Sequence, residues 1–300
     1  MIKKNIIIFG GQGFVGINIC KFFLKVSKNY NIYLVGNKSK LKNIFNKAEK
    51  RKLTFYNINL FNIKKLPKKI FNDSVVINAF LMSNISLKKF KNNYLIFCEI
   101  IKEYNISKFI LLSSISVYGN KKGNISNENI KLNPTSDYAK RCISAEKITQ
   151  KIIKKKIIIL RIANIFGEYR QNKGTIEKLL SIYVFNSNYK FTNLRFKRTY
   201  IYISTLTKII YILVKKNLKK KYIFNVGNPN YIFNFNDIVN KIEKIIKSKI
   251  KYKLNSTKIS VKDSICLPNS LCSEIKFKFK NNFKKEINNI INYLKKNERK

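Results

Sequence analysis

Short apolar runs alternate with amphipathic stretches through the first half of the chain. The runs are rich in Ile, Val and Phe, which is typical of strands buried on both faces of a parallel sheet. Between them, apolar residues recur at helical spacing, as in residues 17–24 and 92–104. The predicted strands are residues 5–9, 31–35, 52–58, 74–80, 108–113 and 156–160. This alternation predicts an α/β protein with a doubly wound parallel sheet that helices cover on both faces.

After residue 160 the pattern becomes mixed. The predicted helices are residues 175–183, 206–214, 235–247 and 283–296, and the predicted extended segments are residues 199–203 and 222–226. We therefore expect a sheet domain over residues 1–170 and a smaller C-terminal lobe over residues 171–300. Ile201–Leu206 and Asn225–Gly227 are expected to pack back on the first domain.

A glycine-rich turn, Gly10-Gly11-Gln12-Gly13-Phe14-Val15-Gly16, separates the first predicted strand from the first predicted helix. This order is typical of a dinucleotide-binding site. Gly10 suits a tight turn, Gly13 lets the backbone approach a pyrophosphate, and Gly16 lets the helix pack closely. The helix N-terminus favours an anion. An ordinary loop with three glycines is the alternative, because a glycine motif alone is weak.

Basic residues dominate the composition. The chain has 62 Lys and Arg against 15 Asp and Glu, a net charge of +47, which suits nucleic acid or an anionic membrane. The lysines are scattered, however, among many Asn, Ile, Phe and Tyr residues, all with A/T-rich codons, and no nucleic-acid-binding module is visible. A bias in base composition is therefore favoured over a nucleic-acid partner. The positive field would still attract anionic substrates.

The cysteines and the apolar stretches bear on location. The five cysteines are Cys20, Cys98, Cys142, Cys266 and Cys272. They have no metal-ligand spacing, and their odd number suits reduced thiols. Lys3-Lys4 precede an apolar run as in a signal peptide, but glycines break that run at once. Tyr200–Val214 comes nearest to a membrane span and is too short. We expect a cytoplasmic protein without a metal or a membrane span.

Further motifs follow in order. They are Ser113-Ser114-Ile115-Ser116-Val117-Tyr118-Gly119, Tyr138-Ala139-Lys140-Arg141-Cys142-Ile143-Ser144-Ala145-Glu146, Leu160–Gly167, Arg198–Ile203 and Asn225–Gly227. With the glycine turn they resemble the extended short-chain dehydrogenase/reductase family, whose members read Ser-Ser-x-x-Val-Tyr-Gly and Tyr-x-x-x-Lys-x-x-x-Glu. The resemblance covers most of the chain. It implies a Rossmann-type fold and an NAD(P)-dependent epimerase, dehydratase or ketoreductase for nucleotide sugars, which commonly forms a homodimer.

The resemblance also implies which residues bind the cofactor. These are Gly10, Gly13, Phe14, Val15, Gly16, Lys38, Asn59, Leu60, Ala79, Phe80 and Cys142. An acidic residue at the end of the second strand favours NAD. Gly36 stands there instead, and Lys38 and Lys40 follow, so there is a slight lean to NADP over NAD. Phe80 and Leu81 are bulky where the family has small residues beside the dinucleotide.

The same resemblance makes Tyr138 the catalytic acid/base and Ser114 the residue that orients the sugar hydroxyl or ketone. A phenol titrates near pH 10, so it acts as a base only beside a group that stabilises phenolate. In the family a lysine four residues after the tyrosine has this role. Cys142 occupies that position. Arg141 is a candidate substitute, whereas Lys140 points elsewhere. Activity is sustained by Arg141, slowed or lost, and the sequence leaves this open.

Two further positions concern the substrate. Asn164 and Arg198 match residues that hold the substrate pyrophosphate in the family, although a surface arginine is an equal alternative. Ile115-Ser116 stand where dehydratases carry Asp-Glu, which disfavours dehydration.

Three hypotheses result. The first is an NAD(P)-dependent sugar-nucleotide epimerase or 4-ketoreductase, acting by Tyr-assisted hydride transfer in the synthesis of a cell-surface polysaccharide. The second is a catalytically weakened or inactive NAD(P)-binding homologue. The third is a basic scaffold that binds nucleic acid.

Overall fold

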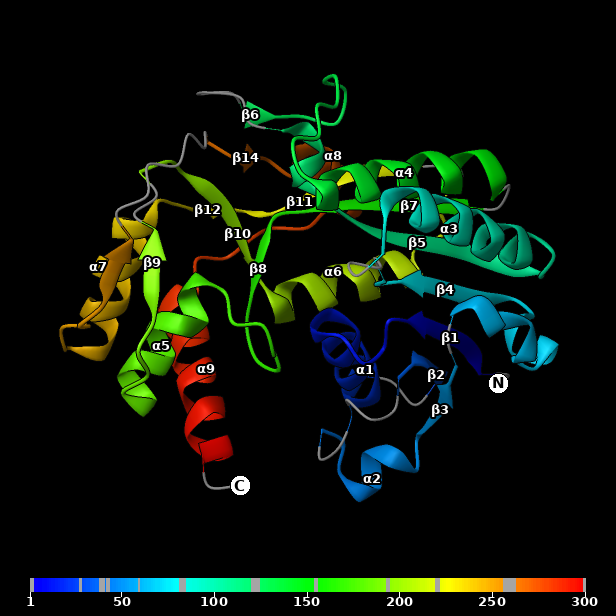
Figure 1. Ribbon diagram of the computed structural model, residues 1–300. Coiled ribbons are helices and arrows are strands. Elements are labelled where there is room, and N and C mark those ends of the chain that lie inside the picture. The colour runs from blue at the N-terminus through cyan, green and yellow to red at the C-terminus, as the bar shows by residue number, and fades with distance from the viewer. Residues whose placement is uncertain are drawn as a thin grey trace. The chain divides into compact units, whose positions relative to one another are not determined.

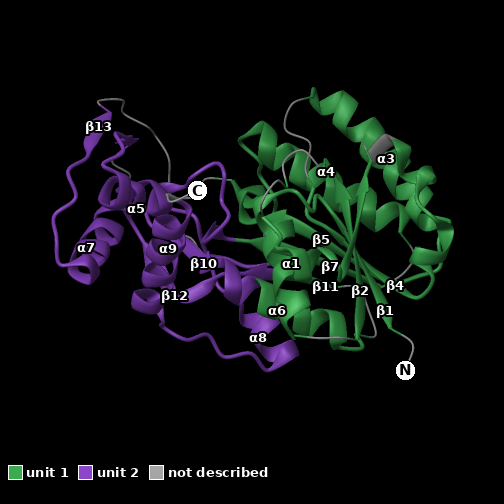
Figure 2. Cartoon of the chain, turned by 90° about the horizontal axis from the view of Figure 1, so that it is seen from below, with its two compact units in different colours: residues 1–119, 131–162, 207–224 green, residues 120–130, 163–206, 225–300 purple. Residues whose placement is uncertain are grey.

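The structure is a computed structural model. It describes residues 3–26, 29–37, 41, 44–58, 60–80, 85–119, 125–153, 156–192, 195–218, 222–255 and 263–298. The chain divides into two compact units (Figure 2). Unit 1 comprises residues 1–119, 131–162 and 207–224, and unit 2 comprises residues 120–130, 163–206 and 225–300.

Unit 1 is built on a seven-stranded sheet (Figure 1). Its strands are β1 (Lys4–Phe9), β2 (Tyr30–Gly36), β3 (Leu53–Asn57), β4 (Ser74–Asn78), β5 (Ile106–Ser114), β7 (Lys156–Ile162) and β11 (Tyr222–Val226). They lie in the order β11-β7-β5-β4-β1-β2-β3, and the pairs from β3 to β7 are all parallel. The strand order therefore reverses beside β1, and the doubly wound sheet predicted from the sequence is confirmed.

Helices cover both faces of this sheet because apolar side chains of each strand point alternately to either side. On one face, Ile7 and Phe9 of β1 join a buried cluster with residues of α3 (Leu87–Lys102) and α4 (Asp137–Ile152). On the other face lie α1 (Phe14–Val26) and α6 (Ile203–Lys215). There the rings of Phe23 and Tyr211 meet with centroids 5.5 Å apart.

Serine side chains fix where two of these helices begin. Ser86 Oγ accepts from the Lys89 N–H at 3.3 Å at the start of α3, and Ser136 Oγ accepts from the Ala139 N–H at 3.2 Å at the start of α4. Such N-caps satisfy backbone donors that the first turn leaves unpaired. The helix predicted over residues 92–104 begins earlier, at Leu87, because the Ser86 cap sets its start. Its first turn is polar, so the apolar periodicity behind the prediction does not extend to it.

Short elements connect the strands of unit 1. They are α2 (Lys47–Lys50) and the 3₁₀ helices η2 (Leu60–Lys65), η3 (Lys68–Phe71) and η4 (Ile115–Tyr118). Of these, η4 directly follows β5 and continues the Ser113–Gly119 motif.

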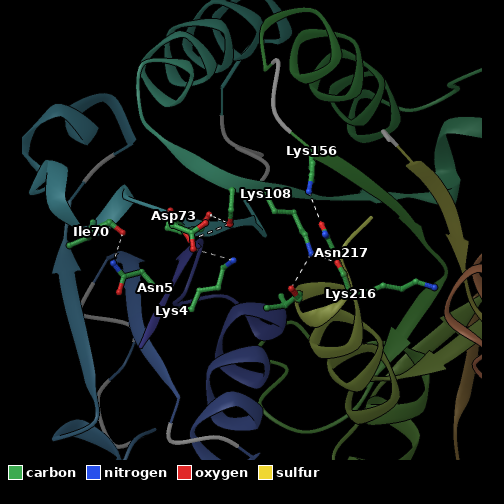
Figure 3. Close-up of polar contacts among 11 residues, drawn as sticks. Lys4, Asn5, Ile70, Asp73, Lys108, Lys156, Lys216 and Asn217 are labelled. Atoms are coloured by element: carbon green, nitrogen blue, oxygen red, sulfur yellow. Dashed lines mark hydrogen bonds and ion pairs between the residues drawn. The ribbon is translucent and has the colours of Figure 1, made fainter. Parts of the chain in front are cut away.

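A buried lysine connects β5 to the end of α6 (Figure 3). Lys108 is 5% exposed, and its Nζ donates to the carbonyl oxygens of Leu213, Val214 and Lys216 at 2.5, 3.0 and 2.8 Å. The last turn of a helix leaves carbonyl groups unpaired, and an ammonium group carries three donors. One side chain thus satisfies the end of α6 inside the protein.

Unit 2 contains smaller sheets and four helices within its described residues. A three-stranded sheet is formed by β8 (Asn164–Phe166), β10 (Arg198–Tyr202) and β12 (Asn228–Phe233). Two-stranded pairs join β9 (Lys190–Thr192) to β13 (Lys253–Asn255) and β6 (Ile125–Ser126) to β14 (Ile265–Cys266). The helices are α5 (Thr175–Phe185), α7 (Phe235–Ile246), α8 (Asn269–Ile275) and α9 (Phe283–Glu298).

Aromatic rings fill the centre of unit 2. The Phe283 ring lies 5.9 Å from that of Phe166 and 5.4 Å from that of Tyr231, between centroids. This contact holds the first turn of α9 against β8 and β12. Across the described residues of both units, no helix combines the length and the apolar character that crossing a membrane requires.

Candidate active site

The glycine turn brings the end of β1 against the end of β4. Gly10 has a φ of +79°, and a Cβ added to it would lie 2.9 Å from the Ala79 carbonyl oxygen. A Cβ on Gly16 would lie 2.4 Å from the Gly10 carbonyl oxygen, so only glycine lets α1 begin this close to the turn. Gly13 N–H donates to the Gly10 carbonyl at 2.9 Å and closes the turn. The predicted geometry at Gly10 and Gly16 is present.

A cavity of about 350 Å³ opens beside this turn. Its walls come from the turn and from the carboxyl ends of β2, β3 and β4, and include Gly10, Gln12, Gly36, Asn57 and Phe80. Phe80 is partly buried and packs on the core cluster. The aromatic ring therefore forms a wall of the cavity and does not fill it.

The residues around this cavity fit a dinucleotide. The first turn of α1, which begins with Phe14 and Val15, carries no acidic residue that would repel a diphosphate. The Gln12 carboxamide oxygen is buried and has no hydrogen-bond partner among the residues that the structure describes, so it has an acceptor position left for a ligand. Lys38, Asn59 and Leu81 lie outside the described residues, as do Lys40 and the side chain of Leu60.

The candidate catalytic residues Ser114 and Tyr138 come together with Cys142 at the end of β5 and the start of α4. Tyr138 is 48% exposed, but its hydroxyl interacts with the side chains of Ser114 and Cys142. Cys142 is fully buried one turn further along α4. The helix thus places the thiol on the same face as the phenol, where the sequence motif predicts it.

Neither group beside the phenol carries a positive charge. Desolvation at its hydroxyl, followed by the Cys142 thiol, raises the pKa of Tyr138 above its ordinary value even though the residue as a whole is 48% exposed, while Ser114 opposes this. Burial also raises the pKa of Cys142 to about 12. Tyr138 is consequently a protonated phenol, and Cys142 a neutral thiol, at neutral pH.

Arg141 directs its guanidinium elsewhere. Its Nη2 donates to the Ile85 carbonyl oxygen at 2.5 Å, and its Nε is buried with no hydrogen-bond partner in the described part of the chain. Arg141 is not among the groups that shift the pKa of Tyr138. Lys140 forms an exposed ion pair with Asp137 at 3.7 Å. In the described structure, then, both basic residues near Tyr138 in sequence have other partners.

A buried ion pair, which the sequence motifs do not reveal, lies one helical turn beyond Cys142. Glu146 Oε2 and Arg161 Nη2 are 2.8 Å apart, with side chains 2% and 4% exposed. Ser113 Oγ donates to Glu146 Oε1 at 2.5 Å, and Arg161 Nη1 donates to the Tyr118 hydroxyl at 3.0 Å. The pair joins α4 to β5, η4 and β7. Only the position of Glu146 could be read from the sequence, because Glu146 follows Cys142 by one helical turn.

Asn164 and Arg198 lie on neighbouring strands of unit 2. Asn164 pairs in register with Tyr200, and its Nδ2 donates to the Thr199 carbonyl at 3.1 Å. The Arg198 guanidinium lies 5.1 Å from the centroid of the Phe196 ring.

Residues 115 and 116 follow Ser114 in η4. Ile115 is buried, and the Ser116 hydroxyl is buried without a hydrogen-bond partner among the described residues. Neither side chain can exchange a proton as the Asp-Glu pair of dehydratases does.

We find no candidate metal site in the part of the chain that the structure describes. No group of three His, Cys, Asp or Glu side chains there could hold a metal ion. The five cysteines are free thiols.

Fold and site together are those of a doubly wound α/β protein with a glycine turn after β1 and a Ser-Tyr pair near the end of β5. The model of the NAD dependent epimerase/dehydratase family matches residues 6–227. The chain therefore belongs to the NAD dependent epimerase/dehydratase family, which confirms the resemblance.

Individual relatives are distant. The chain is 27% identical over 269 residues to the dTDP-D-glucose 4,6-dehydratase of Dictyostelium discoideum, covering 80% of this chain and 61% of that protein. It thus spans about 61% of the length of this relative.

Solved structures share the fold over nearly the whole chain. UDP-glucuronic acid 4-epimerase from Bacillus cereus, in complex with UDP-glucuronic acid and NAD, has a TM-score of 0.81 and 17% identity, over 97% of this chain and 99% of that chain. dTDP-glucose 4,6-dehydratase from Bacillus anthracis, in complex with NAD, has a TM-score of 0.82 and 20% identity, over 99% and 98%.

Proposed function

We propose that this protein is an NAD(P)-dependent sugar-nucleotide epimerase or 4-ketoreductase in which Tyr138 exchanges a proton with a sugar oxygen. The observation that carries the proposal is the contact of the Tyr138 hydroxyl with Ser114, in the same unit as the glycine turn and its cavity. Family membership supports the reaction class. The absence of an acid and a base at Ile115 and Ser116 speaks against dehydration, although one relative is a dehydratase.

Each residue has a distinct role in this proposal. The nicotinamide, when bound, supplies or accepts a hydride at a sugar carbon. Ser114 donates a hydrogen bond to the sugar oxygen and orients it. Tyr138, whose pKa is raised, holds its proton at neutral pH and gives it to a developing alkoxide. Reduction of a ketone is therefore the easier direction for this site.

Unit 2 is proposed to bind the nucleotide-sugar substrate. Arg198 pairs phosphate oxygens through its forked guanidinium, and Asn164 contributes a side-chain amide from the neighbouring strand. The B. cereus enzyme, with the same fold, is a complex with UDP-glucuronic acid, which supports a nucleotide sugar as the substrate class. The cytoplasmic location and the homodimer stay predictions from the sequence.

A second candidate function is a catalytically weakened NAD(P)-binding protein. The specific observations that favour it are the neutral Cys142 thiol and the bond of Arg141 to the Ile85 carbonyl. Without a cation to stabilise phenolate, Tyr138 is a poor base. An epimerase needs both proton removal and proton return, so this deficiency slows epimerisation more than ketone reduction.

The substitution Cys142→Lys separates the two candidates. An ammonium at position 142 lowers the pKa of Tyr138, so we expect NAD(P)H-linked turnover of a nucleotide sugar to increase by about tenfold or more, since each pKa unit is worth about tenfold. Cys142→Ser serves as the uncharged control, and thermal unfolding checks that both variants fold. No gain in Cys142→Lys, together with a loss in Arg141→Ala, would mean that Arg141 already supplies the charge.

A further inference from the structure

The end of β2 lacks the side chain that usually selects the cofactor. In dinucleotide-binding sheets an acidic residue there accepts a hydrogen bond from the adenosine ribose 2′-hydroxyl. This chain has Gly36 at that position, and the cavity beside the glycine turn reaches it. An acceptor for the ribose can therefore come only from another residue beside this cavity.

Gln12 occupies the space that a side chain at position 36 would take. A Cβ added to Gly36 would lie 1.7 Å from Gln12 Oε1 and 2.6 Å from Gln12 Cδ. Both distances are far below van der Waals contact. The carboxamide reaches over from the glycine turn and lies directly against the backbone at the end of β2.

The Gln12 oxygen is also left without a donor. Within the described residues, Gln12 Oε1 is buried and has no hydrogen-bond partner, although leaving a buried acceptor unpaired costs about 1–3 kcal/mol. Such groups call for an explanation, and a ligand that supplies the donor is one. Gln12 and Gly36 both line the cavity of about 350 Å³, so the residue that carries the unpaired oxygen forms part of the wall of a ligand-sized opening.

We propose that Gln12 is the specificity-determining residue for the cofactor: its carboxamide oxygen accepts a hydrogen bond from the adenosine 2′-hydroxyl and so selects NAD over NADP. The assignment rests on the proposed function, namely that this cavity binds a dinucleotide. A 2′-phosphate at the same point brings acceptor oxygens against an acceptor oxygen and offers no hydrogen bond. The slight lean to NADP drawn from Gly36 and Lys38 is thus reversed by a residue of the turn.

Calorimetric titration of the full chain with NAD and with NADP tests this assignment. The wild-type protein is expected to bind NAD about tenfold more tightly than NADP. In Gln12→Ala the affinity for NAD falls about five- to tenfold, as expected for one lost hydrogen bond, and the preference disappears. In Gln12→Glu, where only acceptors remain, NAD still binds and the preference over NADP grows by a further tenfold or so.

The control is Gln171→Ala, an exposed position in unit 2, with both affinities unchanged. Thermal unfolding of each variant verifies folding. Unchanged NAD binding in Gln12→Ala overturns the assignment alone. So does a wild-type preference for NADP that Gln12→Glu abolishes, since the amide group would then be the donor to a phosphate. Failure of the wild-type protein to bind either nucleotide overturns the proposed function as well.

Discussion

At the residue scale, the candidate active site depends on a buried ion pair between Glu146 and Arg161. The Glu146 carboxylate accepts hydrogen bonds from Ser113 and Arg161. Cys142 and Tyr138 lie one and two turns before it on α4. Two buried charges in contact are stable only as a pair, because each alone would lose its hydration without compensation. The pair therefore fixes α4, and with it the phenol, relative to Ser114.

Glu146→Gln is expected to destabilise the protein strongly. The substitution keeps the shape of the side chain but leaves the Arg161 guanidinium buried without a counter-ion, at a cost of about 3–5 kcal/mol in the free energy of unfolding. Urea denaturation measures it. The control is Glu99→Gln, which removes an exposed ion pair to Lys102 and should change stability by about 0.5 kcal/mol or less. Equal effects in the two variants would contradict this account.

Site residues could be located from the sequence where the spacing within a motif fixes their position in the fold. The glycine turn and the Ser-Tyr pair could be located because each motif fixes a backbone geometry or a helix face. The partner of Arg141 could not, since the Ile85 carbonyl is 56 residues away in the chain. Gln12 was overlooked for a similar reason: its relation to Gly36 arises only when β1 and β2 pair.

At the scale of elements, the sheet was foreseen almost entirely because its strands are apolar on both faces. Each predicted strand of unit 1 is present to within a few residues. The missed strands belong to unit 2 and are short or polar. Strand β8 has three residues, and β12 contains Pro229 and two asparagines. Such strands form because a neighbouring strand pairs with them, which no local pattern reveals.

The end of α6 provides a test at this scale. Lys108→Met removes the donor to three carbonyl groups of the last turn, so we expect a loss of about 2–4 kcal/mol in the free energy of unfolding. Lys156 pairs in register with Lys108 on the next strand, but it is exposed and bonds only the Asn217 side chain among the described contacts (Figure 3).

Lys156→Met is therefore the matched control for Lys108→Met, with an expected change of about 0.5 kcal/mol or less. Hydrogen exchange should report the loss in Lys108→Met first at the amides of α6. If the two variants unfold at the same urea concentration, the buried lysine has no special part in holding this helix.

At the scale of the whole molecule, the chain is unusual in its titratable residues as well as in its high net charge. The chain has no histidine, the residue that ordinarily titrates between pH 5 and 8. In unit 2, Glu286 of α9 titrates in this pH range instead. Burial and the nearby Glu168 raise its pKa to about 7, although the Tyr231 hydroxyl opposes this. Its Oε2 is buried and has no hydrogen-bond partner in the described structure.

Stability should therefore fall as the pH rises from about 4.5 to 7. In this window the folded protein holds the Glu286 proton and the unfolded chain has lost it, and above pH 7 the full cost of a buried carboxylate is present. We expect Glu286→Gln to be more stable than wild type at pH 8, by at most about 3 kcal/mol, and the difference to vanish near pH 4. Melting temperatures between pH 4 and 8 give the comparison. The exposed variant Glu103→Gln should follow wild type throughout.

The position of β11 at the edge of the sheet also determines when the sheet of a newly synthesised chain can be completed. Strand β7 ends at Ile162, and its neighbour β11 begins at Tyr222, so residues 163–221 must leave the ribosome before the sheet acquires its last strand. Until then the Ile-rich β7 offers an open edge to other nascent chains. Premature termination in this interval should yield insoluble fragments, and a chaperone that shields β7 during translation should raise the yield of folded protein.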